Sequence, residues 1–201
     1  MTQWGKSKLA RKGRYLGVSL LLVGILAPAG LVAADPPETV PEPEGYRLDD
    51  FRAPVPATLA GATVVTTQSL RRMLERSEDV ILIDVLPAPR KPRNLRPEAL
   101  WLPKKHRNIP GSIWLPNTGY GILPVEEEGY LRQTLVRVTG GDTRRPLVFY
   151  CLADCWMSWN AAKRAVSWSY SNVYWYPDGT DGWADAGLPL EESVAVPATD
   201  D

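Results

Sequence analysis

The segment from Pro146 to Ala165 constrains the fold of this chain more than any other part of the sequence. Its first residues, Leu147 to Tyr150, form a short apolar run that is typical of a buried strand. Residues 157–165 have the pattern of a helix, and Cys151 and Cys155, the two cysteines of the 201 residues, lie between the strand and the helix. A loop that leads from a strand into a helix presents free backbone N–H groups, which hold an anion and lower the pKa of a thiol. We therefore expect the function of this chain to depend on these two cysteines.

The remaining sequence alternates between strand and helix patterns. The expected strands are residues 63–66, 80–85, 113–115, 147–150 and 173–176, and the expected helices are residues 67–74, 126–138, 157–165 and a short segment near Trp183. Residues 80–85 are apolar except for Asp84, as in a central parallel strand that is covered on both faces. The alternation predicts an α/β fold, a central parallel sheet with helices on both faces. Functional sites in such sheets lie beyond the carboxyl ends of the strands, where Asp84 and Cys151 both fall.

The first 34 residues have the pattern of a secretory signal peptide. Five basic residues and no acidic residue precede an apolar stretch from Tyr15 to Leu31, and Val32-Ala33-Ala34 ends it with small residues. The alternative is an uncleaved membrane anchor, because the apolar stretch approaches the roughly 20 residues that a span needs. The expected organisation is a signal peptide over residues 1–34, a Pro-rich linker and N-terminal extension over 35–59, a folded domain over 60–192 and a disordered tail over 193–201.

The charge of the expected mature chain argues against some partners. The whole sequence has 23 basic and 23 acidic residues, and loss of the five basic residues of the leader leaves 18 against 23, a net charge of −5. A mildly acidic domain is a poor ligand for nucleic acid or for an anionic membrane. We expect no nucleic-acid partner, and a membrane contact only through an uncleaved leader.

Four segments, in this order, resemble the rhodanese-like domain. They are Leu82-Ile83-Asp84-Val85, with Leu86 where that family has Arg; His106 to Ile113, with two residues inserted after the His; Val148-Phe149-Tyr150-Cys151; and Gly179 to Pro189. The resemblance implies a rhodanese-like α/β fold with a sulfur-carrying cysteine at position 151.

A narrower resemblance rests on the motif that starts at Cys151 and reads Cys-Leu-Ala-Asp-Cys-Trp, on the leader, on residues 49–56 and on residues 173–177. These segments resemble exported rhodanese-like proteins with a Cys-x-x-x-Cys-Trp motif that are associated with PQQ-dependent (quinoprotein) alcohol catabolism. The resemblance implies a quinoprotein alcohol dehydrogenase, a cytochrome or components of a transport system as partners. It leaves open a redox cofactor at Cys151 and Cys155.

The loop itself favours redox chemistry over transfer from an anionic donor. A cation is expected near a loop that binds thiosulfate or phosphate, but the one charged residue of this loop is Asp154, which should repel anions and raise the pKa of a thiol. Cysteines four residues apart are within reach of a disulfide. Cys151 is expected to attack first, with Cys155 as the resolving thiol. The candidate catalytic residues are Cys151 and Cys155, and the candidate loop or substrate-binding residues are Leu152, Ala153, Asp154, Trp156, Met157, Ser158 and Asp84.

Several alternatives remain open from the residues alone. The two cysteines could form a static disulfide, or bind a soft metal such as Cu(I) with His106, although His106 is expected on an exposed, solvated loop. Trp156 could offer a surface to a quinone or a protein partner, or pack in the core. Asp84 could be a hydrogen-bonded structural carboxylate. A non-catalytic accessory module that presents the loop to a partner is the second functional hypothesis.

Overall fold

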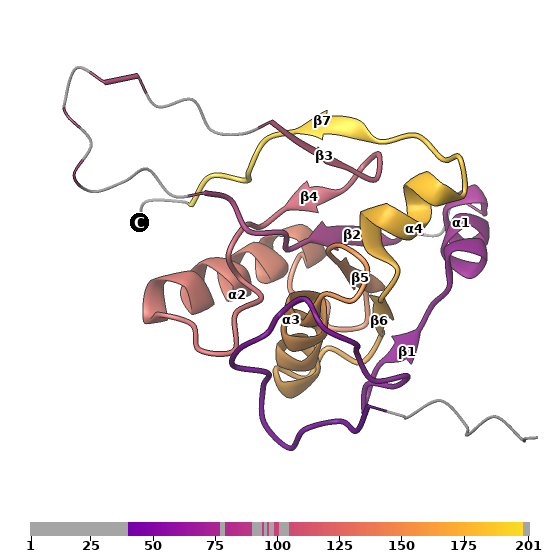
Figure 1. The fold of residues 1–201 in the computed structure, drawn as a ribbon. Helices are drawn as coiled ribbons and strands as arrows, with labels where there is room; N and C mark the ends of the chain where they lie inside the picture. The colour runs from indigo at the N-terminus through magenta and orange to yellow at the C-terminus, as the bar shows by residue number, and fades with distance from the viewer. Residues whose placement is uncertain are drawn as a thin grey trace, which may run out of the picture. The chain divides into compact units, whose positions relative to one another are not determined.

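The computed structural model describes residues 40–76, 79–89, 94, 96, 99–100 and 105–198 (Figure 1). The expected signal peptide lies outside the described residues, as do the first residues of the expected linker and residues 199–201. Among the described residues, no helix combines the length and the hydropathy that a bilayer span requires.

A parallel sheet of five strands organises the described domain. The strands are β1 (Thr63–Val64), β2 (Ile81–Asp84), β4 (Ile113–Trp114), β5 (Leu147–Tyr150) and β6 (Val173–Tyr176). Their order across the sheet is β1-β6-β5-β2-β4, and every neighbouring pair is parallel. The predicted α/β fold with a central parallel sheet is thus confirmed.

Four described helices cover the two faces of this sheet, as the alternation predicted. They are α1 (Thr67–Glu75), α2 (Val125–Thr139), α3 (Trp156–Ser167) and α4 (Gly179–Asp185). Alternate strand residues point to opposite faces. Phe149 and Trp175 join the core beneath α2 and α3. Tyr150 and Tyr176 join the core that contains Leu70 of α1 and Trp183 of α4.

The expected tail differs from the structure where it is described. Residues His106–Asn108 form β3, which pairs antiparallel with β7, Glu191–Ser193, in a small second sheet (Figure 1). Farther along, the Val196 amide donates to the Trp114 carbonyl, and the Tyr130 hydroxyl donates to the Val196 carbonyl. Residues 193–198 are therefore attached to the domain. Ser193 is held by the pairing of β7 with β3, and Val196 is held by its hydrogen bonds with Trp114 and Tyr130.

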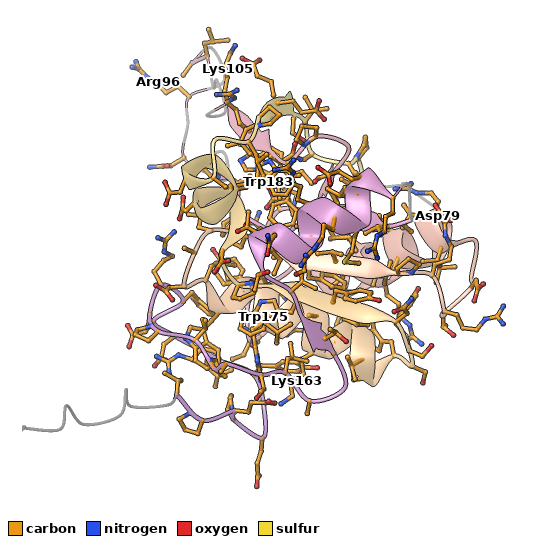
Figure 2. All side chains as sticks on the ribbon, turned by 90° about the vertical axis from the view of Figure 1, so that its right-hand side faces the viewer. Asp79, Arg96, Lys105, Lys163, Trp175 and Trp183 are labelled. Carbon is orange, nitrogen blue, oxygen red and sulfur yellow. The ribbon has the colours of Figure 1, made fainter. Side chains whose placement is uncertain are left out.

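The N-terminal extension runs along α3 as irregular backbone. Asn160 accepts from the Arg47 amide and donates to the Arg47 carbonyl, both at 2.9 Å. Lys163, which is labelled in Figure 2, donates to the carbonyls of Pro43 and Glu44. Residues 40–44, which the sequence placed in a linker, also pack on the domain, since the Glu42 carboxylate accepts from the Thr58 hydroxyl and the Ala60 amide.

Candidate thiol site

Both cysteines lie in the interior at the junction of β5 and α3. Cys151 directly follows the last residue of β5 and is fully buried, and Cys155 is the residue that caps the N-terminus of α3, with 3% of its surface exposed. Both are free thiols, and their side chains share a hydrogen bond. The predicted placement of Cys151 at a strand end is therefore correct.

The start of α4 holds the loop between the two cysteines. The Thr180 amide donates to the Cys151 carbonyl at 2.9 Å, and the Ala153 amide donates to Asp181 Oδ2 at 3.1 Å. Gly179 has a φ of +55°, and a Cβ at this position would lie 2.4 Å from the Cys151 carbonyl oxygen. A glycine is required here because the backbones approach too closely for any side chain.

The electrostatics of the pair reverse the expected order of the thiols. The hydrogen bond from the Cys151 thiol, together with the backbone N–H groups of Met157, Leu152 and Ser158, lowers the pKa of Cys155 to about 7. Burial raises the pKa of Cys151 well above its usual value, and the Cys155 sulfur and the Asp84 carboxylate add to the rise. Cys151 was expected to attack first, but the geometry favours Cys155, because Cys155 occupies the N-terminus of the helix and Cys151 only precedes it.

Asp154 points to solvent at the turn of the loop. It is exposed and has a φ of 50°, a left-handed conformation that Asp tolerates better than most residues. Asp84 is among the groups that raise the pKa of Cys151, whereas Asp154 is not among the groups that shift the pKa of either thiol. The expected effect of Asp154 on both thiols is therefore not supported by the geometry.

A cation does lie near the loop, although the sequence of the loop contains none. Arg52 of the N-terminal extension forms an antiparallel bridge with Cys155 through the backbone. Its guanidinium lies 3.7 Å from Asp181 Oδ2, the oxygen that also accepts from the Ala153 amide. Sequence reasoning missed Arg52 because it lies far from the cysteines in the chain, and no local pattern signals an irregular segment that returns to the loop.

The same extension covers the N-terminus of α3. The Trp156 amide donates to the Phe51 carbonyl at 2.9 Å, and the Trp156 indole donates to the Pro54 carbonyl at 3.1 Å. Trp156 is 2% exposed, and its ring packs edge-on against Trp159 with the Arg47 guanidinium 5.3 Å from its centroid. Trp156 is thus a core residue in this structure and offers no open surface to a partner.

Some of the remaining candidate loop residues are partly exposed and others are buried. Leu152 and Ala153 are partly exposed, whereas Met157 and Ser158 are buried. The Ser158 hydroxyl donates to the Cys155 carbonyl and accepts from the Trp175 indole at 3.0 Å. Ser158 therefore links the cap of α3 to the sheet, and only Leu152, Ala153 and Asp154 face a ligand that approaches from outside.

Asp84 and His106 form a buried pair that the sequence did not predict. His106 is in β3, 9% exposed, and its Nε2 lies 2.6 Å from Asp84 Oδ2. Burial raises the pKa of Asp84, and the hydrogen bond with His106 opposes the rise. The expectation of an exposed, solvated His106 is wrong, because pairing with β7 turns the His side chain inward.

Metal binding finds little support at these residues. His106 Nε2 is engaged with Asp84. Within the described ranges, no group of three or more His, Cys, Asp or Glu side chains could hold a metal ion together. A soft metal at this site would have Cys151 and Cys155 as its protein ligands.

Comparisons with known proteins found similar solved structures and a matching family. Among solved structures, the chain is similar to a polysulfide-sulfur transferase homodimer from Wolinella succinogenes, with 19% identity over 66% of this chain and 80% of that one and a TM-score of 0.41. It is also similar to a rhodanese-like domain from Anabaena, with 18% identity over 68% and 86% of the two chains and a TM-score of 0.41.

A third match is a thiosulfate sulfurtransferase from Pseudomonas aeruginosa, with 18% identity and a TM-score of 0.45. It covers 67% of this chain but only 21% of that protein, so this chain spans about a fifth of its length. No curated protein matches the sequence. The family model of the rhodanese-like domain matches residues 66–186, which is more than half of the chain, and we conclude that the chain belongs to the rhodanese-like family.

Proposed function

We propose that this chain is an exported rhodanese-like thiol protein whose Cys155 and Cys151 alternate between a dithiol and a disulfide. The observation that supports the proposal is the hydrogen bond between two free thiols, with Cys155 at the N-terminus of α3 and its pKa lowered to about 7. Near neutral pH a large fraction of Cys155 is then thiolate, the nucleophilic form. Cys151 stays protonated until the second step.

The redox cycle is a pair of thiol–disulfide exchanges. The Cys155 thiolate attacks one sulfur of a partner disulfide, forms a mixed disulfide and releases the other sulfur as a thiolate. Cys151 then loses its proton to the departing thiolate or to solvent and attacks the Cys155 sulfur. This second step closes the Cys151–Cys155 disulfide and releases the partner in its reduced form, so that the partner gains the two electrons that the dithiol loses.

Sulfur transfer follows the same first step with a different partner. If Cys155 accepts a sulfane sulfur from a persulfide or polysulfide donor, it becomes a persulfide. Attack of Cys151 on the Cys155 sulfur then releases hydrosulfide and closes the disulfide, because the second thiol is already within hydrogen-bond reach. The neighbouring thiol thus favours reductive release of sulfur over its storage.

The proposal also includes where the protein acts and with which partners. The leader pattern of residues 1–34 supports export to the periplasm, and the Cys-x-x-x-Cys-Trp motif that ends at Trp156 supports a role in PQQ-dependent alcohol catabolism. The partners would be a quinoprotein alcohol dehydrogenase, a cytochrome or components of a transport system. Fractionation of cells that express the full chain, followed by N-terminal sequencing, tests the export; retention of residues 1–34 in the membrane fraction would contradict it.

A redox titration tests the thiol chemistry. The reduced protein is equilibrated in dithiothreitol and in glutathione buffers of defined potential, alkylated, and analysed by peptide mass. We expect one two-electron transition between the dithiol and an intramolecular disulfide. Cys151→Ser and Cys155→Ser are the matched variants: both should lose the transition, and Cys151→Ser should keep a reactive thiol that forms a stable mixed disulfide. A dithiol that never oxidises in these buffers would contradict the proposal.

A non-catalytic accessory role is the second candidate, and the burial of the site favours it. Both sulfurs are inaccessible, and Phe51 and Arg52 lie across the helix cap that bears Cys155. An accessory module would need the fold but not the thiols. A Cys151→Ala, Cys155→Ala double variant that still supports growth on an alcohol would favour this role, and loss of growth with the fold intact would favour the redox cycle.

A further inference from the structure

The order of strands creates a crevice between β2 and β5. From β2 the chain proceeds to β4 on one side, and from β5 it proceeds to β6 on the other side. The direction of winding therefore reverses between β2 and β5. In open parallel sheets, ligands bind outside the carboxyl ends of the strands at such a reversal. Here those ends lead into Leu86 and Leu152.

A cavity of about 500 Å³ lies at this place. It is lined by Leu86, Pro87, Pro89, Lys105, His106, Arg107, Trp114 and Leu152. Its volume is in the range of small-molecule sites, about 300–1,000 Å³, and its walls are mainly apolar, as in such sites. Leu152 is the residue next to Cys151, so the cavity reaches the loop that bears the thiols.

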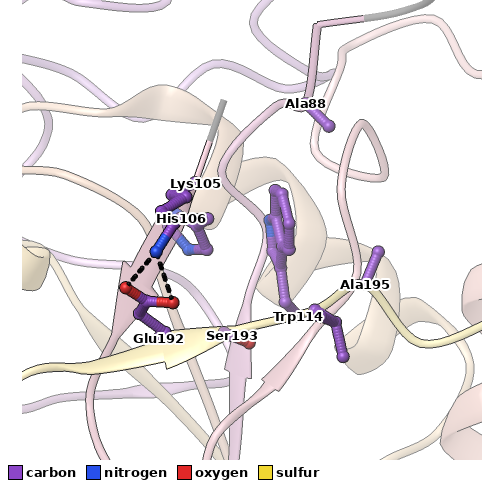
Figure 3. Close-up of a pocket in the computed structure, with 8 residues that line it drawn as sticks. Ala88, Lys105, His106, Trp114, Glu192, Ser193 and Ala195 are labelled. Atoms are coloured by element: carbon purple, nitrogen blue, oxygen red, sulfur yellow. Dashed lines mark hydrogen bonds and ion pairs between the residues drawn. The ribbon is translucent and has the colours of Figure 1, made fainter. Parts of the chain in front are cut away.

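Two rings form a rigid wall of the cavity. The Trp114 indole donates to the Leu86 carbonyl at 2.7 Å, and the ring of His106 lies over it with centroids 4.2 Å apart. His106 is in turn fixed by Asp84. The same two rings line a second cavity of about 440 Å³ on the side of β7, with Ala88, Glu192 and Ala195 (Figure 3). A planar aromatic group would find preorganised stacking partners here.

Two basic residues, Lys105 and Arg107, are among those that line this cavity. The Lys105 ammonium is paired with the Glu192 carboxylate at 2.8 Å (Figure 3). The Arg107 guanidinium donates to the Leu190 carbonyl and has no carboxylate partner among the residues that the structure describes. None of the described residues that line the cavity beside Leu152 is acidic. The fixed donors of Arg107 suit a carboxylate better than a neutral group.

We infer that this cavity is a binding site for a small planar aromatic carboxylate, stacked beside Trp114 and His106 with its carboxylate at Arg107. The binding depends on the cavity and not on the thiol chemistry proposed above. The apolar lining by Leu86, Pro87 and Pro89 favours a ring over a small oxyanion such as thiosulfate.

Calorimetric titration of the full chain with 2-naphthoate tests the inference. We expect saturable binding of 2-naphthoate, with 2-naphthamide at least tenfold weaker and acetate and thiosulfate without measurable binding, since an ionic hydrogen bond of this kind accounts for about a factor of ten. Equal affinity for the acid and the amide, or no saturation by 2-naphthoate at millimolar concentration, would overturn it.

Matched variants locate the site. Arg107→Gln should weaken 2-naphthoate about tenfold and leave 2-naphthamide unchanged, which also shows that the cavity is intact. Arg132→Gln, on the exposed face of α2, is the control and should change neither. Leu86→Trp should fill the cavity and abolish binding of both ligands. Equal losses in the Arg107 and Arg132 variants, or full binding in the Leu86 variant, would place the ligand elsewhere and overturn the inference.

The Cys151→Ser, Cys155→Ser double variant separates this inference from the proposed function. It should bind 2-naphthoate as the parent protein does, because neither sulfur lines the cavity. Binding without a redox transition in the parent protein would refute the redox cycle and keep the site. A redox transition without binding would refute the site and keep the cycle.

Discussion

Arg52 and Cys155 pair through their backbones in an antiparallel bridge, so a segment that precedes the sheet in the chain lies against the thiol that caps α3. The bridge explains two properties of the site together. It brings a guanidinium to a loop that has no cation of its own, and it closes the approach to a buried sulfur.

The first prediction concerns which thiol reacts first. Because the pKa of Cys155 is lowered to about 7 and that of Cys151 is raised, iodoacetamide should label Cys155 first, at a rate that increases as the pH passes through about 7. Cys151→Ala removes the thiol that donates to Cys155 and should shift this rate profile to higher pH. Peptide mass analysis of timed samples measures both. Faster labelling of Cys151 would show that Cys155 is not the thiol at the helix terminus.

The second prediction uses two glycines with similar backbone angles. Gly179 and Gly140 have φ of +55° and +63°, but a Cβ would meet the Cys151 carbonyl at Gly179 and open space at Gly140. Gly140→Ala should cost about 1 kcal/mol of the free energy of unfolding, from backbone strain alone. Gly179→Ala should cost clearly more and also change the labelling rate of the cysteines. Urea denaturation measures the first quantity, and equal costs for both variants would argue against the close approach.

The third prediction tests the N-terminal extension as the cover of the site. Asn160→Ala leaves the Arg47 amide and carbonyl without their partners and should lower the free energy of unfolding by about 2 kcal/mol. It should also speed thiol labelling under native conditions, because the extension detaches more often from α3. Asn172→Ala is the control, since its side chain donates to the Arg144 carbonyl at the surface. An Asn160 variant that is destabilised but labels at the parent rate would show that the extension does not limit access.

The fourth prediction concerns pH and Asp84. The folded protein holds the Asp84 proton more tightly than the unfolded chain does, because burial raises the pKa of Asp84 above 3.8. Over the interval between 3.8 and the raised pKa, the unfolded state therefore binds fewer protons than the folded state, and the contribution of Asp84 to stability falls as the pH rises.

Asp84→Asn should lose this dependence while keeping an acceptor for the Leu86 amide. Urea midpoints of the parent and the variant, measured from pH 4 upward, give the comparison. Parallel curves for the two proteins would show that Asp84 has an ordinary pKa in the folded state.

The sequence predicted correctly those strands and helices that have a clear local pattern of apolar residues. The unbroken apolar runs that contain Ile83 and Phe149 predicted central strands, and the structure places them beside each other in register. The strand, loop and helix around Cys151 were also predicted correctly, because burial on both faces leaves a signature in every residue of such a strand.

The errors at His106 and at Arg52 share one physical cause, which is that their contacts join distant parts of the chain. His106 is turned inward by pairing with Ser193, and neither short strand has a pattern of its own. Arg52 lies in an extension that Trp159 and Lys163 of α3 bind at the carbonyls of Thr58 and Pro43, on either side of Arg52 in the sequence. The order of the two thiols was missed for a different reason. It depends on the residue at which α3 begins, and the spacing of the cysteines does not show which of them lies at the N-terminus of the helix.

The pairing of the N-terminal extension with α3 has a consequence for the order of folding. Arg47 and Arg52 contact residues that follow them by more than half of the chain, so these contacts have a high contact order. Contacts of this kind carry a large loop-closure entropy and form late. The sheet can form its central strands first, and the thiols then remain accessible until the extension docks. A pulse of alkylating agent during refolding would therefore capture Cys155 early and spare it late, and the kinetic phase in which protection appears would be the closing of the extension.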